Sequence, residues 1–134
     1  MPEDAFIVGC TVNERPRKGL IYLIEATKYL PKDAKIHFVL IGKINQKKTI
    51  KCINNNPAKS RIHVLGFRDD APQVLALCDA CILPSLRREG LPKGIIEGMI
   101  YGVAPIITDS GGSPELIENE KSGLIIAPGS ARSI

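Results

Sequence analysis

The feature of this sequence that most constrains its fold is a regular alternation of short apolar runs with stretches of helical pattern. The apolar runs, rich in β-branched and aliphatic residues, lie at residues 6–8, 36–41, 62–65, 80–83 and 104–108. Helical patterns lie between them or follow them, at residues 20–30, 46–54, 72–77 and 94–101. Such alternation predicts right-handed crossovers between parallel strands, with helices on both faces of the sheet. We therefore expect an α/β fold with a doubly wound parallel sheet.

Proline and glycine mark the ends of several of these elements. Pro31 ends the first helix, Pro72 opens the third, and Gly102 is placed to cap the fourth at its C-terminus. Residues 124–130 form a strand-and-turn pattern that leads toward a further helix near Ala131, but the sequence stops three residues later. We therefore expect the sequence to be a piece of a longer protein.

Length and composition favour one globular domain spanning residues 1–134. No apolar stretch is long enough to cross a membrane, and no basic, then apolar leader follows the first methionine. We expect a cytoplasmic protein for which this segment indicates no membrane association. Aromatic residues make up 4% and tryptophan is absent, so a nucleic-acid partner is disfavoured. The net charge of +4 suits a smaller anion, such as a diphosphate.

The loop at residues 84–93 is the first candidate site, because it joins a predicted strand directly to a predicted helix. Doubly wound sheets bind ligands beyond the carboxyl ends of their strands. The free amides at a helix N-terminus can also hold a phosphate. Glu89 lies in this loop and Glu97 about one turn inside the helix. These carboxylates could accept hydroxyl protons from a sugar and a ribose, or they could simply favour the helix dipole.

The loop at residues 13–19 carries three cations, Arg15, Arg17 and Lys18, ahead of a predicted helix. Positive charge at a helix N-terminus opposes the helix dipole, so an anionic ligand is one explanation for it. The alternative, for at least one of the three, is a solvated surface charge. Neither G-x-G-x-x-G nor G-x-x-x-x-G-K-[ST] occurs, which disfavours a dinucleotide dehydrogenase and a P-loop ATPase.

Residues 109–115 follow the fifth strand and contain two adjacent glycines. Gly111 and Gly112 can bring the backbone close to a ligand, and Ser113 before Pro114 is predicted to be a helix N-cap. The sequence has no Asp-x-Asp, and the side chains of the adjacent Asp69 and Asp70 would diverge in an extended loop. We therefore predict no metal site among the carboxylates.

Four cysteines raise the question of a zinc or redox site, since two of them form Cys78-Asp79-Ala80-Cys81. Zinc needs about four ligands, and neither histidine is placed near a second such pair. Cys81 begins an apolar run in which cysteine is a small buried hydrophobe. We predict reduced core thiols.

Taken together, these motifs resemble the C-terminal domain of the retaining GT-B glycosyltransferases of family 4, also called group 1, and the likeness covers nearly the whole chain. The most specific part is the pair of glutamates eight positions apart, which looks like the E-x7-E motif of that family: Glu89-Gly90-Leu91-Pro92, followed by Ile96-Glu97-Gly98-Met99. Residues 109–115 are similar to its D-x-G-G-x-P-E turn, and Lys18-Gly19 to its K-G phosphate loop. The resemblance implies a Rossmann-like domain, the C-terminal half of a GT-B fold.

By that resemblance, Glu89 contacts the donor sugar, Glu97 the ribose, and Lys18 the diphosphate of a nucleoside-diphosphate sugar. The segment Gly90, Leu91, Pro92 and Lys93, together with Gly111 and Gly112, completes the donor site. Pre-placed donors stabilise the negative charge of the leaving diphosphate, so no metal or other cofactor is implied. An N-terminal acceptor-binding domain, absent from this sequence, is the implied partner, and the chain alone is expected to be inactive.

The sequence departs from the family pattern at two positions. Many members carry an arginine where Cys10 follows Gly9, and Arg15 is our candidate substitute as a catalytic cation. Gly98 replaces the usual alanine, which should lower helix propensity by about 1 kcal/mol. Three alternatives stay open: a nucleotide-sugar epimerase-like domain, a non-catalytic nucleotide- or partner-binding module, and a flavodoxin-like receiver domain. The last would be expected to place acidic residues at its strand ends, where this chain has cations.

Overall fold

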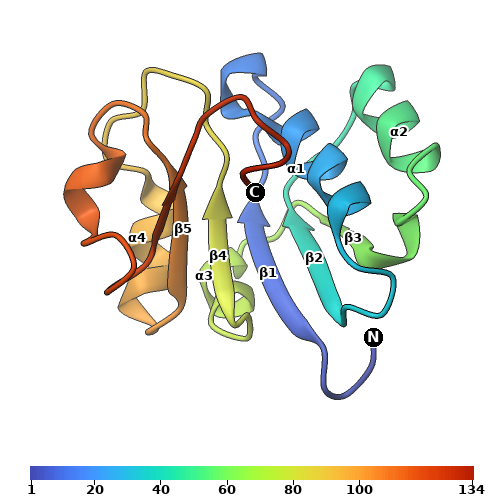
Figure 1. The fold of residues 1–134 in the computed structure, drawn as a ribbon, viewed down its shortest axis with the longest axis horizontal. Coiled ribbons are helices and arrows are strands. Elements are labelled where there is room, and N and C mark those ends of the chain that lie inside the picture. The colour runs from blue at the N-terminus through green and yellow to red at the C-terminus, as the bar shows by residue number, and fades with distance from the viewer.

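A computed structural model describes all residues from 1 to 134 and shows a single six-stranded parallel sheet (Figure 1). Its strands are β1 (Phe6–Thr11), β2 (Ile36–Ile41), β3 (Ile62–Gly66), β4 (Ala80–Leu83), β5 (Ala104–Thr108) and β6 (Leu124–Ile126). Their order across the sheet is β3-β2-β1-β4-β5-β6, so the direction of strand addition reverses between β1 and β4. This is the expected doubly wound, Rossmann-like α/β fold.

The helices cover both faces of the sheet. They are α1 (Leu20–Ala26), α2 (Lys47–Asn54), α3 (Ala71–Leu75) and α4 (Lys93–Ile100). The short 3₁₀ turns are η1 (Pro16–Lys18), η2 (Thr27–Tyr29), η3 (Lys59–Arg61) and η4 (Ser113–Leu116). No helix combines the length and the apolar composition that a membrane crossing requires.

Two apolar clusters hold these layers together, because successive residues of a strand point to opposite faces. In β2, Phe38 and Leu40 pack on the face covered by α1 and α2, while Val39 and Ile41 pack on the face covered by α3 and α4. The strands are therefore apolar on both sides, as is typical of parallel sheets buried between helices.

The ladders within the sheet differ in length. β1 pairs with β2 over six residue pairs, from Phe6 opposite Ile36 to Thr11 opposite Ile41. β1 pairs with β4 over only two, Val8 with Ala80 and Gly9 with Cys81. The ladder that joins the two halves of the sheet is therefore the shortest of its five ladders.

All five predicted strands are confirmed, and the predicted helices are found with ends shifted by a few residues. The pattern near residue 124 forms the sixth strand. Gly102 follows α4 with a φ of 77°, which is the predicted glycine C-cap geometry. Residues 131–134 form no helix; this segment turns back so that Ile134 packs against the α1 side of the core (Figure 1).

Candidate functional site

Three loops meet beyond the carboxyl ends of the central strands: residues 12–19 after β1, 84–92 after β4, and 109–112 after β5. The first two follow the adjacent strands at which the strand order reverses. Backbone hydrogen bonds join all three loops: the Leu86 amide donates to the Arg17 carbonyl at 2.7 Å, and the Gly112 amide donates to the Glu89 carbonyl at 2.9 Å. This edge is where a doubly wound sheet places its ligand.

Two glycines explain how these loops come so close. Gly19 has a φ of 69°, and a Cβ at this position would lie 1.8 Å from the carbonyl oxygen of Pro84. Gly111 has a φ of 61°, and a Cβ there would lie 1.9 Å from the carbonyl oxygen of Glu89. A side chain at either position would both clash and strain the backbone. The glycine pair of residues 111–112 therefore has a structural role, which is to seat the backbone of Glu89.

Glu89 is the buried charged group at the centre of the site. Its side chain is 7% exposed, and the Lys18 ammonium donates to Oε1 at 2.7 Å and to Oε2 at 2.9 Å. The Ser85 hydroxyl donates to Oε2 at 2.6 Å, and a guanidinium nitrogen of Arg17 lies 3.9 Å from the same oxygen. Burial alone would raise the pKa of Glu89, but the hydrogen bonds from Lys18 and Ser85 outweigh burial and lower this pKa below its ordinary value.

Ser85 is a site residue that sequence reasoning missed. It follows the buried strand β4, is fully buried itself, and its carbonyl accepts a hydrogen bond of 2.5 Å from the Thr108 hydroxyl at the end of β5. A small polar residue two positions after a buried strand was the only signal in the sequence. Its importance depends on Glu89 folding back toward it, which the spacing of four residues does not dictate.

Glu97, the second carboxylate of the predicted pair, lines the same hollow as Lys18. It stands one turn inside α4, its side chain is 25% exposed, and Lys93 is 3.4 Å away. Glu97 and Lys18 both line an open hollow of about 300 Å³, together with residues of the β1 loop and of the start of α4: Thr11, Val12, Asn13, Leu83, Pro92, Lys93 and Gly94. Lys18 therefore contacts Glu89 from the same hollow that Glu97 lines.

The remaining residues of the predicted donor segment lead into this hollow. Gly90 and Leu91 are exposed, while Pro92 is buried and precedes α4, which begins at Lys93. No side chain caps the N-terminus of α4. Gly94 is needed in its first turn because a Cβ there would lie 2.2 Å from the Thr11 hydroxyl.

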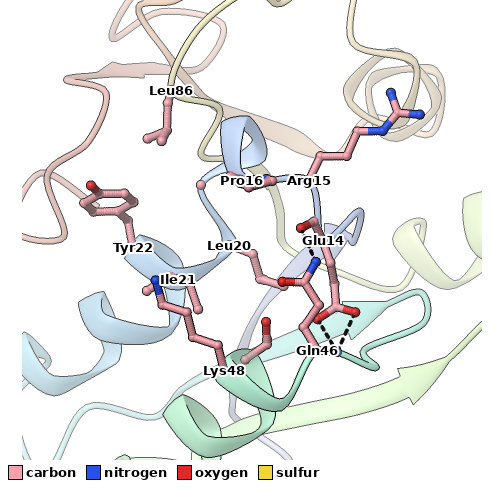
Figure 2. Close-up of a pocket in the computed structure, with 11 residues that line it drawn as sticks. Glu14, Arg15, Pro16, Leu20, Ile21, Tyr22, Gln46, Lys48 and Leu86 are labelled. Atoms are coloured by element: carbon pink, nitrogen blue, oxygen red, sulfur yellow. Dashed lines mark hydrogen bonds between the residues drawn. The ribbon is translucent and has the colours of Figure 1, made fainter.

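Arg15 lies elsewhere. Its exposed side chain lines a second hollow of about 280 Å³ between α1 and α2, and Figure 2 shows it extending away from Tyr22 and Lys48. In the same hollow, Glu14 accepts a hydrogen bond from the amide of Gln46, just before α2 (Figure 2). It also accepts one from the amide of Asn45. The cation that the structure brings to Glu89 besides Lys18 is Arg17, and the role proposed for Arg15 stays a prediction.

The predicted N-cap role of Ser113 is wrong. η4 begins at Ser113 itself and Gly112 occupies the cap position, without a side-chain hydrogen bond. The Ser113 hydroxyl is fully buried and has no hydrogen-bond partner.

All four cysteines are free thiols. Burial raises the pKa of Cys10 to about 12 and that of Cys81 to about 11, so both thiols stay protonated at neutral pH. Cys78 is buried beside Gly9, and burial raises its pKa as well. That Cys78 and Cys81 bind no zinc stays a prediction, and zinc analysis of chelator-washed protein would test it.

Comparisons with known proteins agree with this architecture. The family described as glycosyl transferases, group 1, matches residues 1–134. A UDP-Gal:α-D-GlcNAc-diphosphoundecaprenol α-1,3-galactosyltransferase of Escherichia coli is 33% identical over 131 residues, which cover 94% of this chain and 34% of that protein. An N,N′-diacetylbacillosaminyl-diphospho-undecaprenol α-1,3-N-acetylgalactosaminyltransferase of Campylobacter jejuni is 34% identical over 109 residues, covering 80% and 27%.

Solved structures show the same likeness. The crystal structure of HepE from Anabaena in complex with UDP and glucose superposes with a TM-score of 0.88 at 29% identity, over 97% of this chain and 36% of that one. The chain thus spans about a third of the length of the relatives it matches. It belongs to the group 1 glycosyltransferases, and its doubly wound sheet is a Rossmann-like domain of the GT-B fold.

Proposed function

We propose that this chain binds a nucleoside-diphosphate sugar, and that the complete enzyme transfers the sugar to an acceptor with retention of configuration and without a metal ion. The observation that carries the proposal is that Lys18 is hydrogen-bonded to the buried Glu89 and lines one hollow with Glu97. The relatives support it, since HepE was crystallised with UDP-glucose and the Escherichia coli relative is a UDP-Gal galactosyltransferase.

In the proposed complex, each group has a separate partner. Glu97, which lines the hollow, accepts hydrogen bonds from the ribose hydroxyls, and the uncapped start of α4 faces the diphosphate. Lys18 moves from Glu89 to the diphosphate, which leaves Glu89 free to accept a hydrogen bond from a hydroxyl of the sugar. The charge of Lys18 and the α4 dipole then stabilise the departing diphosphate, so the chain itself supplies the positive charge.

The acceptor and the rest of the catalytic machinery belong, in this proposal, to an N-terminal domain of the longer enzyme. The 134-residue chain then binds the donor but does not turn it over. We place the enzyme in the cytoplasm, where its free cysteines would stay reduced.

Calorimetric titration with UDP, GDP, ADP and CDP sugars, and with the corresponding free diphosphates, tests the proposal. We expect one base to be preferred and binding to persist in a chelator. Glu97→Gln should weaken binding of the free diphosphate by about 1–3 kcal/mol, because the amide offers one neutral acceptor oxygen in place of two charged ones. Glu89→Gln should not weaken that binding, because Lys18 no longer has to leave a carboxylate to reach the diphosphate. It should weaken only binding of the nucleotide sugar.

Three results would contradict the proposal: no binding of any nucleotide by the folded chain, binding that requires a divalent ion, or equal losses in the two variants for the free diphosphate. Circular dichroism and thermal melting establish first that both variants are folded. Glutamine keeps the size of the side chain, so a difference between the two variants reports the carboxylate charge rather than packing.

A further inference from the structure

Ser85 holds the buried side of the Glu89 carboxylate. Its hydroxyl donates to Oε2 at 2.6 Å, and the residue, two positions after the end of β4, is 0% exposed. Its own backbone is fixed from the next strand, because the Thr108 hydroxyl donates to the Ser85 carbonyl and Thr108 is also buried. Although Ser85 lies in a loop, its backbone is therefore held in place by the end of the neighbouring strand β5.

The two oxygens of Glu89 have different surroundings. Oε1 has Lys18 as its hydrogen-bond donor, and Lys18 lines the open hollow. Oε2 accepts hydrogen bonds from both Lys18 and Ser85, and a guanidinium nitrogen of Arg17 lies farther away, at 3.9 Å. When an anionic ligand draws Lys18 away, Ser85 is the hydrogen-bond donor that stays on the carboxylate.

We propose that Ser85 is a positioning residue, which fixes the orientation of the Glu89 carboxylate so that its free oxygen faces the donor sugar. This inference rests on the proposed function, since it needs Glu89 to contact the sugar. The terminal torsion of a glutamate is broad and roughly two-fold, so an unsupported carboxylate has no single orientation. Ser85 removes that freedom in the interior, before the ligand arrives, and binding then requires less ordering.

The consequence is selective for the sugar part of the donor. Ser85 touches neither the hollow that holds the diphosphate in our proposal nor Glu97. Loss of its hydroxyl should therefore weaken the binding of a nucleotide sugar while the affinity for the free nucleoside diphosphate stays the same. A residue with a purely structural role would weaken both together through loss of folded protein.

Ser85→Ala tests the inference, and Ser113→Ala is its matched control. Both serines are fully buried, and both variants lose one hydroxyl, but the Ser113 hydroxyl has no partner. NMR titration of the Glu89 carboxyl should show a higher pKa in Ser85→Ala and no change in Ser113→Ala. Calorimetry with UDP-glucose and UDP should show the preference for UDP-glucose falling about five- to tenfold in Ser85→Ala alone, which is the scale of one hydrogen bond.

The outcomes separate this inference from the proposed function. If Glu89→Gln abolishes the preference for UDP-glucose over UDP but Ser85→Ala keeps it, Glu89 binds the sugar without needing Ser85, and the inference is wrong. An unchanged Glu89 pKa in Ser85→Ala would also overturn it. If Glu89→Gln itself keeps the preference, or wild type binds no nucleotide sugar of the panel, the proposed function fails and the positioning role fails with it.

Discussion

Replacing Lys18 with methionine removes the main hydrogen-bond donor of a buried carboxylate while keeping an apolar side chain of similar length. The Lys18 side chain is 19% exposed and that of Glu89 is 7%, so the pair is largely screened from water. Removing one member of a buried ion pair costs about 3–5 kcal/mol, because the other charge stays desolvated. In Lys18→Met, the Ser85 hydroxyl would still donate to the Glu89 carboxylate at 2.6 Å, and Arg17 lies 3.9 Å away. The carboxylate therefore keeps one hydrogen bond and one nearby positive charge.

We therefore expect Lys18→Met to destabilise the chain by about 2–3 kcal/mol at neutral pH. For a domain of this size, that loss corresponds to a fall in Tm of about 6–12 °C. Circular dichroism melts and guanidinium titrations, read as the free energy of unfolding, measure it.

Lys93→Met is the matched control. Lys93 also faces a glutamate, Glu97, at 3.4 Å, but its side chain is 89% exposed. An exposed pair four residues apart on a helix contributes little, so the control should melt with wild type. If Lys18→Met melts within error of Lys93→Met, the hydrogen bonds to Glu89 do not stabilise the fold as argued.

The pH dependence supplies an independent check. The pKa of Glu89 is lower in the folded chain than in the unfolded chain, so its contribution to stability is present above the unfolded value and is lost as the pH falls through the folded value. A protonated Glu89 needs no cation. The destabilisation caused by Lys18→Met should therefore be largest near pH 7 and shrink as the solution is acidified through the carboxyl range. A pH-independent difference would refute the electrostatic explanation.

Two further substitutions test the packing of the site and of α4. Gly98→Ala should destabilise the chain by about 1–2 kcal/mol despite the better helix propensity of alanine, because the new Cβ would lie 2.7 Å from the Cys81 sulfur. Adding Cys81→Ala should recover part of that loss, which a double-mutant cycle by chemical denaturation would measure. Gly111→Ala should lower Tm more than Gly102→Ala. Both glycines have a positive φ, but only at Gly111 would the new Cβ clash with backbone, at the carbonyl of Glu89. Equal losses would show that backbone strain alone causes the destabilisation.

The fold was predictable from the sequence because its strands are short, apolar on both faces and separated by clear helix boundaries. Proline and glycine placed several of these boundaries well, as Pro72 and Gly102 show. α1 begins at Leu20 as predicted, but the 3₁₀ turn of residues 16–18 before it, separated from it by Gly19 in a left-handed conformation, was not predicted. Local pattern carries information about periodicity, but not about such a break.

The site was only partly predictable, because its decisive contacts are made across the sheet. Lys18 and Glu89 were identified by a family resemblance that gave them different parts of the ligand to contact. In this structure they are hydrogen-bonded to each other, although 71 positions separate them in the sequence. Ser85 was missed for the same reason. Gly98, an apparent departure from the family pattern, is explained by the sulfur of Cys81 on a strand that no local pattern connects to it.

The two-residue ladder between β1 and β4 has a consequence for the motions of the domain. Regions held by few backbone hydrogen bonds open at lower free energy than the global fold, so the seam between the sheet halves is a candidate boundary between cooperative units. The loops after β1 and β4 meet at the carboxyl end of this seam. A ligand bound by both loops would therefore hold the two halves of the sheet together and raise the free energy of opening. Hydrogen exchange of the Gly9 and Cys81 amides, which lie on the facing edges of β1 and β4, should then slow on ligand binding by more than exchange within the β2–β3 ladder. The two halves of the sheet would then move as one unit only once the ligand is bound.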